Sequence, residues 1–276
     1  MNYYCLIAGL PDIEIEDNKL TFSLVSFKEE LRHYLSRSDF QLISLYYTKF
    51  DNQNLLRYLK NKEVEFDNRG NIAKDELEEY FKQFGEDIVP KNKHIPLYFK
   101  CFLEEYWDEQ NADKGEANWE NRLTELYYQW AMRCDNRFIT SWFEFNLNLN
   151  NILAACISRK YKIDMEPMGN NEVAEAIKTS RQRDFGLKEI IEELDISEML
   201  DDENFDLFER EKDLDLLKWQ WLDRQTFFEY FSIERVFAYM LQLEIIERWL
   251  SLNPEKGGKI FRELINNLKD NVVKHK

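Results

Sequence analysis

Residues 116–161 read EANWENRLTELYYQWAMRCDNRFITSWFEFNLNLNNILAACISRKY, and this stretch decides the fold class. On both sides of Asp135-Asn136, apolar side chains recur three and four residues apart, which is the pattern of two amphipathic helices. Neither half contains a Gly or a Pro, the residues that most strongly interrupt a helix. The stretch therefore predicts a long helical hairpin that turns at Asp135-Asn136.

A second hairpin is expected from residues 204–252, with its turn near Arg224-Gln225. Eight Gly and five Pro in 276 residues are few, and Leu, Glu and Lys favour helices over a turn-rich sheet. We therefore predict an all-α protein built from several helical hairpins, with at most a minor β element near the N-terminus. The apolar run of residues 1–10 fits either a buried strand or a first helical turn, and both interpretations stay open.

Residues that interrupt helices, chiefly Gly, Pro, Asn and Asp, set the expected limits of the remaining helices. Helices are predicted for Phe27–Leu35, for a segment capped by Ser38 that runs to about Lys60, and for 73–84, 97–107 and 258–272. The segment Asp67–Asn71 is expected to form a turn. Asp113-Lys114-Gly115 and residues 167–171 interrupt the pattern, which gives an N-terminal lobe at 1–112, a hairpin at 113–165 and a C-terminal lobe at 166–276, or one continuous domain.

The charge limits the classes of partner. With 37 basic and 53 acidic residues, the net charge of −16 disfavours binding to nucleic acid or to anionic lipids. The chain has no basic, apolar leader and no run of 18 apolar residues, so we expect a cytoplasmic protein that does not enter the bilayer. Cys5, Cys101, Cys134 and Cys156 form no CxxC pair and are expected to be buried free thiols.

No motif in the chain indicates a catalytic, metal or cofactor site. Glu30 and His33 form one ExxH, but helical di-iron sites need two such motifs and two further glutamates. The run 256–259, KGGK, is expected to be a simple loop-to-helix junction rather than a phosphate site. We therefore expect no catalytic residues, no metal ligands and no cofactor.

Candidate contact residues come from aromatic and charge patterning. Trp219 and Trp221 lie roughly 200° apart on a helix, so the two cannot face the same core and one is a candidate partner contact. Residues 186–215 hold thirteen acids and three bases, including Glu189, Glu192 and Glu193. Residues 256–276 hold six bases and two acids, including Lys256 and Lys259. This polarity predicts partners of opposite charge at the two segments.

Three stretches resemble known families. The C-terminal hairpin reads Glu209-Arg210-x-x-Asp213, then FSIERVFAYM at 231–240, then Glu244, Glu247 and Arg248-Trp249. The middle helix carries Phe143-Glu144, then NLxxIL at 148–153, then RK at 159–160. Both are similar to the C/d subunit of V-type and A-type rotary ATPases. The opening YYCLIAGLP at 3–11 resembles an uncharacterised bacterial family that is encoded beside V-type ATPase genes.

The resemblance has departures. Glu144 stands where the family has an Asp and lies one position early, and Ala154 stands where an Arg is expected. The acids Glu244 and Glu247 are three residues apart rather than two. The resemblance implies an elongated or funnel-like body without an active site, which caps the membrane rotor ring and receives the central shaft on the cytoplasmic side.

Two other hypotheses remain. The first is a free-standing acidic helical module that binds a different protein. The second is an enzyme whose site is assembled around His33 or His94, which requires a pocket that brings a histidine and carboxylates together.

Overall fold

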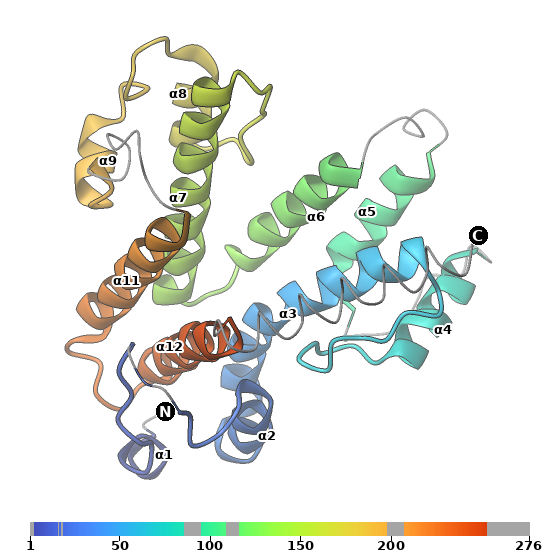
Figure 1. Ribbon diagram of the computed structural model, residues 1–276. Helices are drawn as coiled ribbons and strands as arrows, with labels where there is room; N and C mark the ends of the chain where they lie inside the picture. The colour runs from blue at the N-terminus through green and yellow to red at the C-terminus, as the bar shows by residue number, and fades with distance from the viewer. Residues whose placement is uncertain are drawn as a thin grey trace, which may run out of the picture. The chain divides into compact units, whose positions relative to one another are not determined.

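A computed structural model describes residues 3–15, 17, 19–85, 95–108, 116–197 and 207–252. These residues form eleven helices and no strand, so the all-α prediction is confirmed (Figure 1). The sequence left open whether the apolar run at the N-terminus is a strand or a helix. The structure shows a short helix, α1 (Tyr4–Ala8). The predicted helix at 258–272 lies outside the described residues.

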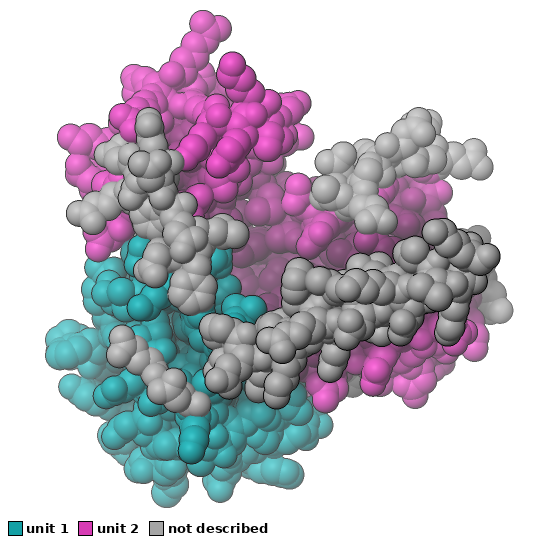
Figure 2. Space-filling model, viewed as in Figure 1, with its two compact units in different colours: residues 1–35, 211–276 teal, residues 36–210 magenta. Residues whose placement is uncertain are grey.

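The chain divides into two compact units, which Figure 2 colours separately. Unit 1 joins the two ends of the sequence, residues 1–35 and 211–276, and unit 2 contains residues 36–210. The division predicted from breakers placed its boundaries elsewhere, after residues 112 and 165. Breakers interrupt local helical patterns, whereas a compact unit also depends on contacts between segments that are distant in sequence.

Unit 1 is built around its last described helix. Its described helices are α1, α2 (Leu24–Tyr34), α11 (Leu207–Thr226, in this unit from residue 211) and α12 (Ile233–Ser251). Helix α12 buries most of its length, and Phe27 of α2 packs edge-on against Tyr239 with ring centroids 5.5 Å apart. The Tyr239 hydroxyl donates to the carbonyl of Pro11 at 3.0 Å, which ties the N-terminal segment to α12.

The described part of unit 2 forms seven helices: α3 (Arg37–Lys60), α4 (Lys74–Gly85), α5 (Leu97–Trp107), α6 (Glu116–Ala131), α7 (Arg137–Tyr161), α8 (Glu172–Thr179) and α9 (Lys188–Glu193). Helix α6 packs against α3, α5 and α7, so it lies at the centre of the helical core. The Tyr127 hydroxyl of α6 is buried and donates to the Leu45 carbonyl of α3 at 3.0 Å. The predicted hairpin at 116–161 is confirmed as the α6–α7 pair.

Two predicted helix starts were wrong, and in both cases the helix is capped by a serine that lies earlier in the sequence than the predicted start. Helix α3 is capped by Ser36, whose hydroxyl accepts from the backbone N–H of Asp39, and not by Ser38. Helix α2 begins at Leu24, because Ser23 and Ser26 form a reciprocal capping box. Both corrections move the start by one turn or less.

The second hairpin and the cysteines also differ from expectation. Helix α11 continues to Thr226, so the turn lies at residues 227–232 and not at Arg224-Gln225. All four cysteines are free, as expected, but none is fully buried: Cys5 and Cys101 are exposed, and Cys134 and Cys156 are half-buried. Apolar neighbours in the sequence did not predict burial, because adjacent residues of a helix point to different faces.

Candidate protein-interaction surface

The two tryptophans proposed as alternative contacts have different environments. Trp219 is 9% exposed and packs with Ile245 and Ile246 of α12, together with Ile13 and Trp249. Trp221 is half-buried. Trp219 is therefore a core residue, and Trp221 is the better-exposed candidate of the pair.

The predicted acidic contacts lie in the other unit. Glu189, Glu192 and Glu193 are exposed on the short helix α9. Glu192 makes an ion pair with Lys188 at 3.7 Å, and such an exposed pair contributes little to stability. The predicted basic contacts Lys256 and Lys259 lie outside the described residues.

An aromatic surface that sequence reasoning missed lies in unit 1. Phe227, Phe228 and Tyr230, in the connection between α11 and α12, are 63%, 81% and 62% exposed. Phe231 follows, and its ring centroid lies 4.4 Å from that of Tyr4 in α1, which is also exposed. Figure 1 shows this connection running beside α1. We call these five residues the aromatic turn.

Hydrogen bonds to neighbouring helices fix the backbone of the aromatic turn. The N–H of Tyr3 donates to the Phe231 carbonyl at 2.7 Å, and the N–H of Glu229 donates to the Thr226 carbonyl at 2.9 Å. The Thr226 hydroxyl donates to the Leu222 carbonyl at 2.8 Å and accepts from Arg235 at 3.3 Å. The exposed rings therefore project from a backbone that is tied at both ends.

A polar network joins α11 to α12 toward the end of the hairpin that is remote from the aromatic turn. The Asp215 carboxylate is 2% exposed, accepts from the Arg248 guanidinium, and accepts from the Trp249 indole N–H at 2.8 Å. Arg248 also donates to Glu211 at 3.1 Å. Burial, together with the charge of Arg248, lowers the pKa of Lys218, whose ammonium lies 3.9 Å from Asp215. These paired charges hold the two helices in register.

Glu244 of α12 lies close to the same network. Burial raises the pKa of Glu244 to about 8, with Glu247 adding to the rise and Arg248 opposing it. A carboxyl with this pKa is largely protonated at neutral pH, so it can donate as well as accept a hydrogen bond.

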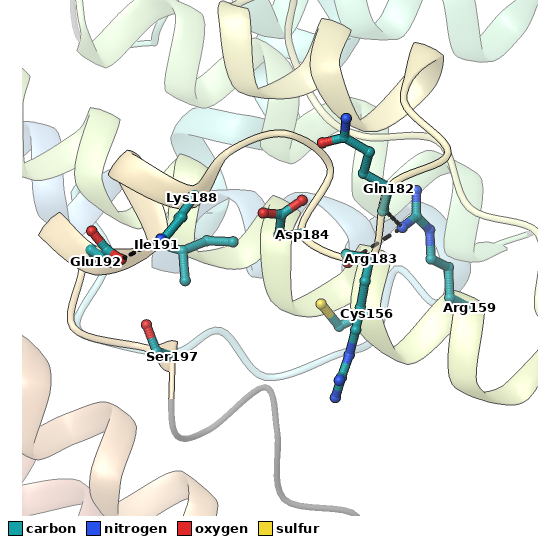
Figure 3. A pocket seen from close by; sticks show the side chains of 9 residues that line it. All are labelled: Cys156, Arg159, Gln182, Arg183, Asp184, Lys188, Ile191, Glu192 and Ser197. Carbon is teal, nitrogen blue, oxygen red and sulfur yellow. Dashed lines mark hydrogen bonds and ion pairs between the residues drawn. The ribbon is translucent and has the colours of Figure 1, made fainter.

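A cavity of about 740 Å³ in unit 2 offers a second candidate site (Figure 3). Cys156 and Arg159 of α7 face it, opposite Ile191 of α9. The Arg159 guanidinium donates to the carbonyls of Ser180, at 2.7 Å, and of Gln182, and it lies 3.7 Å from the ring centroid of Phe185. Arg159 therefore has a structural role, because it fixes residues 180–185 against α7.

Only part of the enzyme hypothesis falls on residues that the structure describes. Glu30 and His33 are both exposed on α2, and His94 lies outside the described residues. Within the described ranges, no three His, Cys, Asp or Glu side chains gather closely enough to hold a metal ion. No described helix is both long and apolar enough to cross a lipid bilayer.

Comparison with known proteins places the chain in a family. Residues 1–272 match the model of a family described as "Protein of unknown function (DUF2764)". No curated protein and no solved structure matches the chain. Because the family model spans nearly the whole sequence, the chain belongs to the DUF2764 family.

Proposed function

We propose that this protein is a non-catalytic helical adaptor that links the central shaft of a rotary ATPase to its membrane rotor ring. It has the same task as the C/d subunit that its sequence resembles. It acts on the cytoplasmic face, peripheral to the membrane, and binds no nucleic acid. The proposal assigns it no catalytic step and no cofactor.

One observation carries the proposal. The α11–α12 hairpin, which bears the resemblance from residue 209 to residue 249, is also the hairpin that presents the aromatic turn. Its interior is fixed by the buried Asp215 and its bonds to Arg248 and Trp249. A stiff hairpin with exposed aromatic residues at its tip suits a protein that transmits force through protein contacts, because aromatic residues dominate interface energetics.

The second resembling segment has a comparable structural task. In α7, Leu149 and Ile152 are fully buried, and Asn148 accepts a hydrogen bond from the Asn171 amide at 2.7 Å. The neighbouring Asn151 side chain bonds both the N–H and the carbonyl of Met168. These contacts hold the loop that precedes α8 and support the interpretation of this helix as a rigid element that can transmit force.

The net charge sets the manner of binding. A chain of net charge −16 is repelled by anionic lipid surfaces, so membrane association has to come through other proteins. The exposed acids of α9 would then face a basic surface of a partner, where rim charges mainly set the encounter rate.

Purification of the tagged full chain from native membranes tests the function. We expect rotor-ring and central-shaft proteins to copurify in fixed ratio, as measured by quantitative mass spectrometry against an untagged strain. Copurification of a different protein, with the ATPase components at background level, would favour the alternative of a free-standing acidic interaction module.

A further inference from the structure

We propose that a small cavity in unit 2, between α6, α7 and the loop that precedes α8, binds a primary alkylammonium group. The group belongs either to a free alkylamine or to a lysine side chain of another protein, and its chemistry is the same in both. The inference goes beyond the adaptor function proposed above and does not depend on it. It concerns a site that no motif in the sequence identified.

The size of the cavity limits the size of its ligand. Its volume is about 200 Å³, whereas pockets for drug-sized molecules measure roughly 300–1,000 Å³. Side chains of α6 and α7 and residues 169–171 line it, and all of them are described. The cavity therefore fits a ligand of only a few non-hydrogen atoms, such as a short alkyl chain with one polar group.

Most of the cavity wall is apolar. Tyr128 and Met132 of α6 face Leu147 of α7 across the cavity. Leu147 is buried, and the Tyr128 ring packs edge-on against Phe143 with ring centroids 5.9 Å apart. Burial of an alkyl chain against this wall is favourable, because it removes apolar surface from water. The wall therefore accounts for the alkyl part of the ligand.

The charged side chains that line the cavity are both carboxylates, Glu125 and Glu144. Arg122 donates to Glu125 at 2.7 Å, but it also pairs with Glu105 at 2.6 Å, so one guanidinium serves two carboxylates. The Glu144 side chain is exposed and forms no ion pair with another described residue. Three carboxylates against one guanidinium leave an excess of negative charge, which favours a cationic ligand.

The charges next to the lining residues along the chain do not cancel this excess. Besides Arg122, the residues within four positions of a lining residue include one base, Arg133, and four acids, Asp135, Glu166, Glu172 and Glu175. All five are exposed and none of them lines the cavity. Both the cavity and the residues that flank its lining are therefore acidic.

The loop side of the cavity is held in place without a ligand. Gly169 has a φ of 81°, which favours glycine, and its N–H donates to the Glu125 carboxylate at 3.2 Å. The Asn171 amide donates to Asn148 of α7 at 2.7 Å, and its oxygen caps α8 by accepting from the N–H of Ala174. A ligand that enters therefore orders little of the protein, which reduces the entropic cost of binding.

An ammonium group suits this site better than a metal ion. It carries three N–H donors and no acceptor, and the oxygens of Glu144 and of the exposed Asn170 are available to accept from it. Among the described residues, no three His, Cys, Asp or Glu side chains gather closely enough to hold a metal. The apolar wall would also supply a metal with no ligands.

Methyl NMR of the full chain with labelled methionine tests the site. The probe is n-butylammonium, which has the stem and head group of a lysine side chain. It is titrated at about 150 mM salt, which screens general attraction to the acidic chain. The Met132 methyl resonance, assigned with Met132→Leu, reports on the cavity, and Met240, buried in α12 of unit 1, is the internal control.

We expect a saturable shift at Met132 and none at Met240, with a dissociation constant of about 1–10 mM for so small a ligand. The neutral 1-butanol and the anionic butyrate keep the alkyl chain, and both should bind at least about tenfold more weakly. The absence of a saturable shift at Met132 would overturn the proposal, as would equal affinity for either of the two control ligands.

A pair of variants tests the role of the carboxylate. Glu144→Gln should weaken binding of n-butylammonium about tenfold, and the exposed position lets the fold tolerate the change. Glu120→Gln removes the same charge from an exposed position of α6 outside the cavity and should leave the affinity unchanged. Equal effects of the two substitutions would contradict the assignment.

A lysine blocked at both ends, N-acetyl-lysine N-methylamide, distinguishes the two sources of the group. If it binds as tightly as n-butylammonium, the site takes a lysine side chain of another protein; if only n-butylammonium binds, the site takes a free alkylamine. Both results support an alkylammonium site, and failure of both ligands to bind overturns it. Copurification of rotor-ring and central-shaft proteins tests the adaptor function separately, so either proposal can fail without the other.

Discussion

Asp51 illustrates how one buried side chain can determine the path of a whole loop. It is 2% exposed in α3, and its carboxylate accepts from the backbone N–H groups of Asn71 and Ile72, at 2.7 and 3.0 Å. Gly70 lies so close that a Cβ there would overlap an Asp51 oxygen. The predicted turn at 67–71 is therefore confirmed, but the residue that holds it lies far back in the sequence.

We expect Asp51→Ala and Gly70→Ala each to lower the free energy of unfolding by about 2–4 kcal/mol. The first leaves two backbone donors without their acceptor, and the second forces the carboxylate away. The double variant should lose less than the sum, because the clash disappears once Asp51 is gone. Urea denaturation of the four proteins measures this, with Glu65→Ala, an exposed acid nearby, as control. Simple additivity would contradict the contact.

Glu244 gives a prediction in the pH dependence of stability. Its folded pKa of about 8 lies above the unfolded value of 4.5, so the folded chain binds the proton more tightly. Its contribution to stability is therefore full below pH 4.5 and is lost as the pH rises toward 8. Glu244→Gln should remove this loss, so that its stability relative to the parent rises by on the order of 2–4 kcal/mol between about pH 5 and about pH 9.

Urea unfolding at one-unit steps of pH across that range measures the difference. Glu229→Gln, which removes an exposed carboxyl from the same hairpin, serves as the control for the substitution itself. A Glu244→Gln curve parallel to the parent would show that this carboxyl does not titrate there.

At the scale of single helices, the spacing of apolar residues predicted some helix ends well and others poorly. The helix at 97–107 was predicted with its observed ends, because Pro96 fixes its start and the polar Asp108 its end. The start of α3 was misplaced because Ser36 and Ser38 are both good caps; the spacing of Ser36 and Asp39, three residues apart, was the better signal. The turn at 227–232 was missed because it contains neither Gly nor Pro.

In the α11–α12 hairpin, we expect Trp219 to stabilise the fold and Trp221 to contact a partner. We expect Trp219→Ala to cost about 3–5 kcal/mol of stability, since it removes a large side chain from the core of unit 1. Trp221→Ala should cost about 1 kcal/mol or less and should instead weaken binding to the partner. Thermal unfolding and partner titration of both variants check this. Equal loss of stability in the two would refute the assignment.

At the scale of the whole molecule, the sequence predicts well which charged segments are exposed. It predicts poorly which segments, distant in the sequence, belong to the same compact unit. The acids of α9 were expected to be exposed and are, but nothing local indicated that Glu189 and Trp221 lie in different units. Unit 1 depends on contacts such as Phe27 with Tyr239, which no periodicity within either segment encodes. The five members of the aromatic turn come together for the same reason.

Charge reversal of α9 tests long-range attraction to the partner. Replacing Glu189, Glu192 and Glu193 with Lys should slow association with the isolated partner about tenfold at about 50 mM salt and only about two- to threefold at about 500 mM. Stopped-flow or surface-binding kinetics measure the rates.

A variant with an equal change in net charge elsewhere is the control, with Lys at the exposed positions Glu63, Glu65 and Glu79. It should slow association less than the α9 variant at low salt. Equal slowing would mean that only the total charge matters and that α9 has no oriented role.

The discontinuity of unit 1 has a consequence during translation. Helix α2 carries Leu24, Phe27 and Leu31, which are fully buried in the finished protein, and it packs against α12. Residues 36–210 are made in between, roughly 175 residues. At ribosomal rates this takes on the order of 10–35 s. Throughout that interval the apolar stripe of α2 is without its partner on the nascent chain, which makes it a natural binding site for a chaperone until α12 leaves the exit tunnel.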